Sequence, residues 1–239
     1  MASSMLGQIT LFPYDFAPSG WKFCDGSKLP KSDYFWLYEV LQDTFGGDDL
    51  YVYLPDLRDI APPNCHYCMK VTGDFPVGSY PGLTGETFFL ATSAPTPPNM
   101  KECAGQALPK GRYQYLETYM GTRFGGGPTT FNMPDLRTKS PMGLNYLLPV
   151  DGSSPDSSPL RDSFLGELFL VPFELSRNIY LTLCDGKELY AQTQPYLYQL
   201  LGNRFGGTNP RFALPDLRGA APSQFNYYLN LGGTVPPRP

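Results

Sequence analysis

The chain of 239 residues has few of the side chains on which acid–base catalysis and metal binding depend. It contains one histidine, two tryptophans and 17% charged residues, with a net charge of −4. A lone histidine removes most general acid–base pairs and most histidine-based metal sites. No run of Lys and Arg is present, and phosphate neutralisation needs clustered positive charge, so nucleic-acid binding is disfavoured.

Long apolar runs are also missing. No run approaches the roughly 18 residues typical of a membrane span, and residues 1–5 lack the basic and apolar regions of a signal peptide. We therefore expect no membrane span and no conventional signal peptide. This leaves open a cytoplasmic location before assembly or a place on a virion or extracellular particle. By contrast, 25 glycines and 26 prolines indicate a loop-rich chain, and 41% hydrophobic residues are too many for a disordered one.

The sequence is organised around a repeated tetrapeptide, Pro-Asp-Leu-Arg. It occurs at residues 55–58, 134–137 and 215–218, in steps of 79 and 81 residues. Phe-Gly-Gly begins ten residues before each of these prolines, and Cys-X-Gly begins 31 residues before. One unit of about 80 residues is therefore written three times. The predicted modules are residues 6–83, residues 84–160 and residues 161–239. The second of these is the most diverged copy.

The sequence of each module predicts the same short secondary-structure elements. An opening strand, the Cys-X-Gly turn, a short helix, the Phe-Gly-Gly turn and two further strands follow in order. Ser32 and Thr193 are expected to cap the starts of their helices, and Pro195 is expected in the first turn of its helix. Gly121 and Gly202 are expected directly after the last turns of theirs. The fold class is thus α+β. Because one module is close to the lower size limit for an adequate core, we expect the three to pack as a pseudo-threefold trimer made from one chain.

The pattern of the five cysteines indicates side chains packed in the core rather than metal ligands or disulfides. Cys24, Cys103 and Cys184 occupy the same position in each module, so they cannot pair within a module, and free buried thiols are expected. The stretch Cys-His-Tyr-Cys at residues 65–68 looks like half a zinc site. Its cysteines, however, replace apolar strand residues of the other copies, and no second histidine exists. We predict no metal and no cofactor.

The aspartate of each tetrapeptide stands two residues before its arginine. This spacing favours a turn-capping carboxylate paired with the guanidinium, while an anion or sugar contact by the arginines stays open. A catalytic pair would rarely be kept in triplicate, so we predict no catalytic residue and no enzyme. The pairs are Asp56 and Arg58, Asp135 and Arg137, and Asp216 and Arg218.

Together these motifs resemble the phage tail collar domain, as found in the microcystin-dependent protein family. The first copy carries the resemblance through Gly-Gln-Ile at residues 7–9, Gly-Trp at 20–21, Cys-Asp-Gly at 24–26 and Leu-Pro-Asp-Leu-Arg at 54–58. The middle copy departs at Met100 and Ala104, which replace Trp and Asp. The resemblance implies a small domain of tail fibres and similar surface structures, often trimeric, with no common catalytic residues.

Two functions follow as expectations. The first is a non-enzymatic structural or attachment protein of a phage-tail-like, fibre or surface assembly, which recognises other structural proteins or a surface glycan. The alternative is a soluble, lectin-like carbohydrate-binding protein.

The loops that differ between copies are the expected contact surface, although merely tolerant loops remain an alternative. These loops are residues 14–19, 92–99 and 174–178, with 48–53, 127–130 and 208–211 after the helices. Their aromatic and amide side chains suit stacking and hydrogen bonding to a sugar or protein. The candidate binding residues are Tyr14, Phe16, Tyr51, Tyr53, Asn178 and Asn209.

Overall fold

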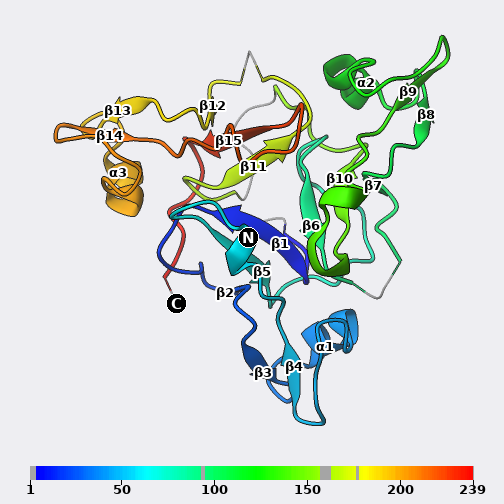
Figure 1. Ribbon diagram of the computed structural model, residues 1–239, viewed down its shortest axis with the longest axis horizontal. Coiled ribbons are helices and arrows are strands. Elements are labelled where there is room, and N and C mark those ends of the chain that lie inside the picture. The colour runs from blue at the N-terminus through cyan, green and yellow to red at the C-terminus, as the bar shows by residue number, and fades with distance from the viewer. Residues whose placement is uncertain (1–3, 93–94, 157–162, 176–177, 239) are drawn as a thin grey trace.

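A computed structural model describes residues 4–92, 95–156, 163–175 and 178–238, and Figure 1 shows its arrangement. The chain is α+β, and the three modules repeat one order of elements: three strands, a helix and two strands. Module 1 contains β1 (Gln8–Phe12), β2 (Trp21–Phe23), β3 (Lys28–Pro30), α1 (Phe35–Leu41), β4 (Tyr51–Tyr53) and β5 (His66–Lys70). Module 2 contains β6 (Phe88–Leu90), β7 (Met100–Glu102), β8 (Ala107–Pro109), α2 (Gln114–Met120), β9 (Thr130–Asn132) and β10 (Tyr146–Pro149). Module 3 contains β11 (Leu168–Val171), β12 (Leu181–Leu183), β13 (Glu188–Tyr190), α3 (Pro195–Leu201), β14 (Arg211–Ala213) and β15 (Asn226–Asn230). Short 3-10 turns follow two of the repeated arginines, at Arg58–Ile60 and at Arg137–Lys139, and a third lies at Pro141–Gly143.

Every module has a central part and a projecting part. In the centre, the last strand lies between the first two and pairs antiparallel with both, as in β2-β5-β1 and β11-β15-β12. The third and fourth strands form a separate antiparallel hairpin beside the helix. We call each helix with its hairpin an arm: residues 28–53, 107–132 and 188–213. Figure 1 shows the three arms pointing away from the central strands in different directions.

The helices form because one face of each buries apolar side chains. Leu37 and Leu41 of α1 are 1% and 0% exposed, as the predicted spacing requires. The predicted caps are wrong, since α1 begins after Tyr34 without a side-chain cap bond and the Ser32 hydroxyl donates to Asp33. Likewise Thr193 donates to the carbonyl of Tyr190 and does not cap α3.

The helix ends follow the prediction. Pro195 is the first residue of α3, and Gly121 and Gly202 follow α2 and α3 with φ of 53° and 55°. At the same place after α1 stands Gln42, with φ 50° and ψ −141°. Side chains rarely adopt that conformation, which glycine adopts freely. The first module therefore keeps the turn of the other two with a less suitable residue.

In the described part of the chain, each module contacts both others. Strands β1 and β6 pair antiparallel, which joins modules 1 and 2 in one six-stranded sheet. Between modules 2 and 3, the amide of Thr87 donates to the carbonyl of Leu170 at 2.7 Å. Between modules 3 and 1, the amide of Ser19 donates to the carbonyl of Pro237 at 2.9 Å. The main apolar core accordingly contains residues of all three modules.

Candidate functional site

The arms carry an exposed aromatic ring at the same position in every module. Trp36, Tyr115 and Tyr196 are the second residues of α1, α2 and α3, and they are 65%, 49% and 63% exposed. Each comes directly before the leucine that anchors its helix in the core, and because neighbouring positions of a helix face different directions, the ring points outward. The sequence offered a signal that we missed: an aromatic residue directly before that leucine in all three copies.

The ring of Trp36 belongs to a small aromatic group on module 1. It meets the ring of Phe35 edge-on at 5.2 Å and that of Phe75 at 6.3 Å between centroids. Phe35 is itself 53% exposed. Large aromatic side chains left in water forgo the free energy of burial, and when they gather on one surface they indicate a contact site.

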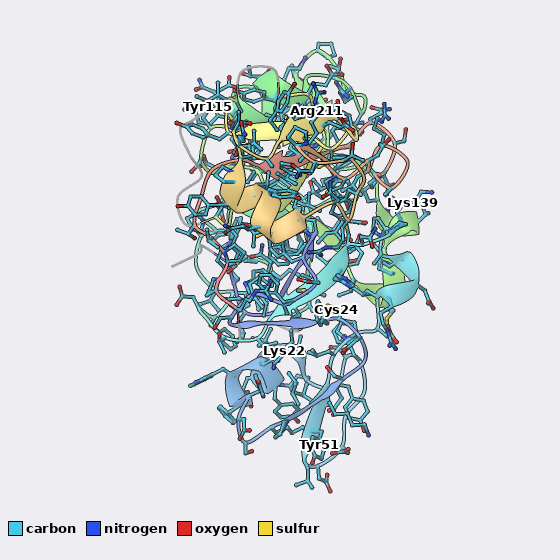
Figure 2. All side chains as sticks on the ribbon, turned by 90° about the vertical axis from the view of Figure 1, so that its left-hand side faces the viewer. Lys22, Cys24, Tyr51, Tyr115, Lys139 and Arg211 are labelled. Carbon is cyan, nitrogen blue, oxygen red and sulfur yellow. The ribbon has the colours of Figure 1, made fainter. Side chains whose placement is uncertain are left out.

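Three of the predicted binding residues lie on the arms. Figure 2 shows Tyr51 at the far end of arm 1, where its side chain is exposed. The hydroxyl of Tyr53 donates to Asp48 at 3.0 Å, and the ammonium of Lys28 lies 4.5 Å from its ring centre. Asn209 is exposed in the turn of arm 3. These side chains are therefore placed where a partner could reach them.

Two other predicted residues are in the interior. Tyr14 is 0% exposed and stacks between the rings of Phe12 and Phe16, each 5.4 Å away. Its hydroxyl donates to the carbonyl of Leu165 in module 3. Phe16 is only 9% exposed, with the guanidinium of Arg238 over its ring. The prediction of a surface contact by Tyr14 is wrong, because this loop packs into the boundary between modules.

Asn178 supports the backbone. Its amide oxygen accepts the backbone N–H groups of Tyr180 and Leu181, and its amide nitrogen donates to the carbonyl of Pro155 at 2.8 Å. An amide in a loop serves turn formation as readily as binding, and the sequence pattern does not distinguish the two. Residues 93–94 and 176–177 of the predicted loops lie outside the described residues.

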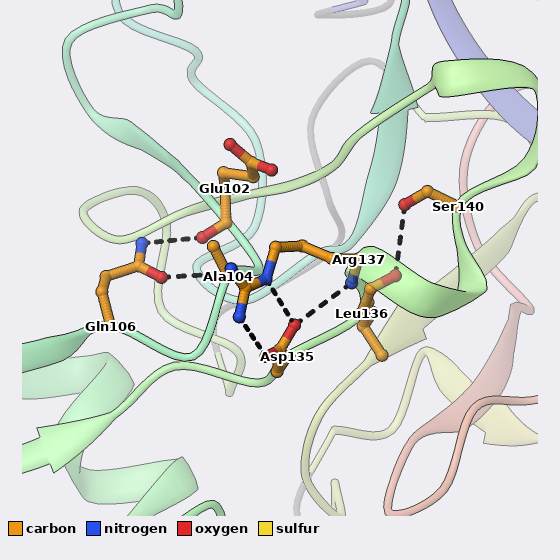
Figure 3. A network of polar contacts seen from close by, with 7 residues as sticks. All are labelled: Glu102, Ala104, Gln106, Asp135, Leu136, Arg137 and Ser140. Carbon is orange, nitrogen blue, oxygen red and sulfur yellow. Dashed lines mark hydrogen bonds and ion pairs between the residues drawn. The ribbon is translucent and has the colours of Figure 1, made fainter.

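The repeated Asp–Arg pairs have one geometry in all three modules. In module 2, shown in Figure 3, Arg137 donates from Nε to Oδ1 of Asp135 at 2.9 Å and from Nη2 to Oδ2 at 2.6 Å. The backbone N–H of Arg137 also donates to Oδ1, at 3.3 Å. These hydrogen bonds lower the pKa of Asp135 to about 2. The predicted turn-capping carboxylate with a paired guanidinium is confirmed, and modules 1 and 3 repeat the distances.

The diverged turn of module 2 has a different side-chain hydrogen bond from that of module 1. In module 1 the carboxylate of Asp25 accepts the N–H of Ser27 at 3.0 Å. Module 2 has Ala104 there, and the side chain of Gln106 accepts the N–H of Ala104 at 3.1 Å and donates to the carbonyl of Glu102 at 2.7 Å. Figure 3 shows the two contacts of Gln106. The loss of an aspartate from the motif therefore leaves the turn supported.

All five cysteines are buried and free. Cys65 and Cys68 are 2% and 0% exposed, in the place of apolar residues of the other modules. Burial raises the pKa of Cys65 to about 12 and that of Cys68 far above its usual range. Such thiols stay protonated and are poor nucleophiles. Among the described residues there is no group of three His, Cys, Asp or Glu side chains arranged to hold a metal ion.

The described part of the chain also contains no helix long and apolar enough to cross a membrane. No curated protein and no solved structure matched the sequence. The sequence profile of the phage tail collar domain, by contrast, matches three times, at residues 7–62, 85–141 and 166–222. These segments cover well over half of the chain, one in each module. The chain therefore belongs to the phage tail collar domain family, with three tandem copies, and is a structural protein of the tail-fibre type.

Proposed function

We propose that this protein is a non-enzymatic attachment component of a phage-tail-like, fibre or surface assembly, and that it docks onto a structural partner protein through its arms. One observation carries the proposal: an exposed aromatic ring at the equivalent position of all three helices. Aromatic residues are enriched among the side chains that dominate binding at protein interfaces. The leucine beside each ring is buried in the core, whereas the ring itself is 49–65% exposed.

A single chain is proposed to present the arms as a self-contained pseudo-trimer, with modules at 6–83, 84–160 and 161–239. The contacts between every pair of modules support this closure, as does the apolar core they share. A partner with threefold symmetry would then meet three similar contact points at once. Binding at several linked points strengthens attachment without any single strong contact. Tyr51, Tyr53 and Asn209 would add to the contact on arms 1 and 3.

The test removes all three rings and measures attachment. A variant with Trp36→Ala, Tyr115→Ala and Tyr196→Ala should bind the native assembly at least about tenfold more weakly. Sedimentation with purified assemblies measures this, and circular dichroism checks the fold. The matched control changes the exposed fifth residue of each helix, with Glu39→Ala, Thr118→Ala and Gln199→Ala, and should bind normally. If both variants bind the assembly equally well, the rings of the arms are not part of the contact.

The alternative function is that of a lectin-like, carbohydrate-binding protein. The feature that favours it is a cavity on module 1, not the exposed rings of the arms.

A further inference from the structure

A cavity of about 460 Å³ opens on module 1, beside the turn that carries the repeated Asp–Arg pair. It lies near Cys24, which Figure 2 places where the central strands meet arm 1. Its volume is within the range of roughly 300–1,000 Å³ typical of small-molecule sites. Its lining is Asp15, Phe23, Cys24, Asp25, Leu57, Arg58, Ala61, Pro62, Cys65, His66 and Tyr67.

Most of the lining is apolar, and three of its side chains, Phe23, His66 and Tyr67, carry flat rings. The rings of Phe23 and His66 lie 5.1 Å apart between centroids. Leu57 and Cys65 line the cavity as buried neighbours, at 2% exposure each. The planes of the Phe23 and His66 rings are inclined at 58°, so a ligand with a flat face of C–H groups can stack on one ring while the other ring contacts its edge.

The polar groups of the lining have hydrogen-bonding capacity left. Asp25 accepts one backbone N–H through Oδ1, and a carboxylate has about four acceptor positions. Arg58 donates to Asp56 from Nε and Nη2, which leaves the N–H groups of Nη1. A carboxylate and a guanidinium at one cavity can bind neighbouring hydroxyl groups, the first as acceptor and the second as donor.

The charge of the cavity disfavours anions. Two carboxylates, Asp15 and Asp25, line it together with one guanidinium, Arg58, whose charge Asp56 already neutralises. Arg204 of module 3 lies 3.6 Å from Asp15 and offsets that charge. Desolvation and the nearby Arg204 lower the pKa of His66, so its ring is neutral at pH 7. A neutral, hydroxyl-rich ligand fits this balance best.

We propose that this cavity binds one neutral sugar ring, packed in the angle between the rings of Phe23 and His66, with its hydroxyl groups held by Asp25 and Arg58. The other modules do not carry this set. At the positions of Phe23, Asp25 and His66, module 2 has Glu102, Ala104 and Asn145, and module 3 has Leu183, Asp185 and Asn226. The site is therefore specific to module 1, and its lining does not include the exposed rings Trp36, Tyr115 and Tyr196 of the arms.

The single histidine makes the site directly observable. His66 supplies the only imidazole signals in the proton NMR spectrum, so any ligand in the cavity shifts an assigned reporter. We would titrate the full chain separately with the methyl glycosides of glucose, galactose, mannose and N-acetylglucosamine, and with the free sugars. At least one should shift the His66 signals saturably in the millimolar range. Binding of the methyl glycoside indicates a glycan residue as the source, and binding of the free sugar alone indicates a free monosaccharide.

Two matched variants decide whether the cavity is responsible. Asp25→Ala and Asp185→Ala each remove a carboxylate that accepts the N–H two residues later, at 3.0 Å and 3.2 Å, so both cost the fold the same bond. Asp25→Ala should weaken sugar binding about tenfold or more, whereas Asp185→Ala should leave it unchanged.

Three results would overturn the proposal: no sugar shifts His66, both aspartate variants weaken binding equally, or an aromatic peptide shifts His66 while sugars do not. The triple arm variant should keep the sugar-induced shift. Failure of arm docking and failure of this site are thus distinguishable.

Discussion

At the scale of single residues, a buried side chain follows the opening glycine of each module. Gln8, Glu86 and Glu167 each accept the backbone N–H three residues earlier, at 3.1, 3.4 and 2.8 Å. Burial raises the pKa of Glu86 to about 8, with the nearby Glu167 adding to it, and burial raises the pKa of Glu167 to about 7. Two modules therefore keep an acid where the first has an uncharged amide of the same shape.

This substitution predicts how stability depends on pH. Because the pKa of Glu86 is higher in the folded chain than the usual 4.5, its contribution is fully present below pH 4.5 and is lost as pH rises through 8. Glu86→Gln should match the wild type near pH 4.5 and exceed its free energy of unfolding by roughly 5 kcal/mol at pH 9. Urea unfolding across this range measures it, with Glu39→Gln on an exposed helix face as control. A constant difference at all pH values would contradict the assignment.

At the scale of elements, the ends of the helices differ in how well their residues suit the backbone. Gln42 and Gly202 end α1 and α3 with nearly the same φ and ψ, but only glycine adopts them without strain. Gln42 does gain a hydrogen bond to the carbonyl of Glu39 at 3.1 Å, at an exposed position where such a bond contributes little.

Exchanging the two residues tests this reading. Gln42→Gly should raise the free energy of unfolding by about 1 kcal/mol, and Gly202→Gln should lower it by about 1–3 kcal/mol. A Cβ at Gly202 would meet no atom within 4 Å, so the second change measures backbone strain without a clash. Thermal and urea unfolding provide both values. Changes of the same sign in the two variants would refute strain as the cause.

The elements themselves could be predicted well from the sequence, because their periodicity and turn residues are local. The capping residues of α1 and α3 could not. The N–H groups of Asp33 and Tyr34 donate to the carbonyl of Pro30 and form a turn that delays α1 beyond Ser32. The surface could be predicted only in part, since Tyr14 and Asn178 look like binding residues until their partners across module boundaries are known. The exposed ring of Trp36 and the cavity beside His66 likewise depend on long-range packing.

At the scale of the whole molecule, each module inserts a segment beside the opening glycine of another. The ring of Tyr14 in module 1 packs beside Gly166 of module 3, and Phe173 of module 3 packs beside Gly85 of module 2. A Cβ on Gly85 would lie 2.4 Å from Phe173, so glycine is required there. Between modules 2 and 1, the backbone of residue 91 takes this place, and its N–H donates to the carbonyl of Gly7 at 3.0 Å. The order of insertion is cyclic.

In this cyclic order the opening glycine of every module is covered by a segment of another module of the same chain. We therefore expect the protein to be a monomer. Multi-angle light scattering of the pure protein should give the mass of one chain, 26.6 kDa. The value should stay constant on dilution. A stable homotrimer of the full chain would contradict the self-contained pseudo-trimer.

The covalent linkage of three copies has an evolutionary consequence. In an assembly of three identical chains, a substitution appears three times, so a change that is useful in one place must be tolerated in all. Here the Cys-His-Tyr-Cys stretch exists once, the aspartate of the Cys-X-Gly turn is missing once, and glutamine takes the place of the glycine after the helix once. Because the three copies are separate stretches of one chain, each can change alone, and a repeated framework can acquire a feature that occurs once.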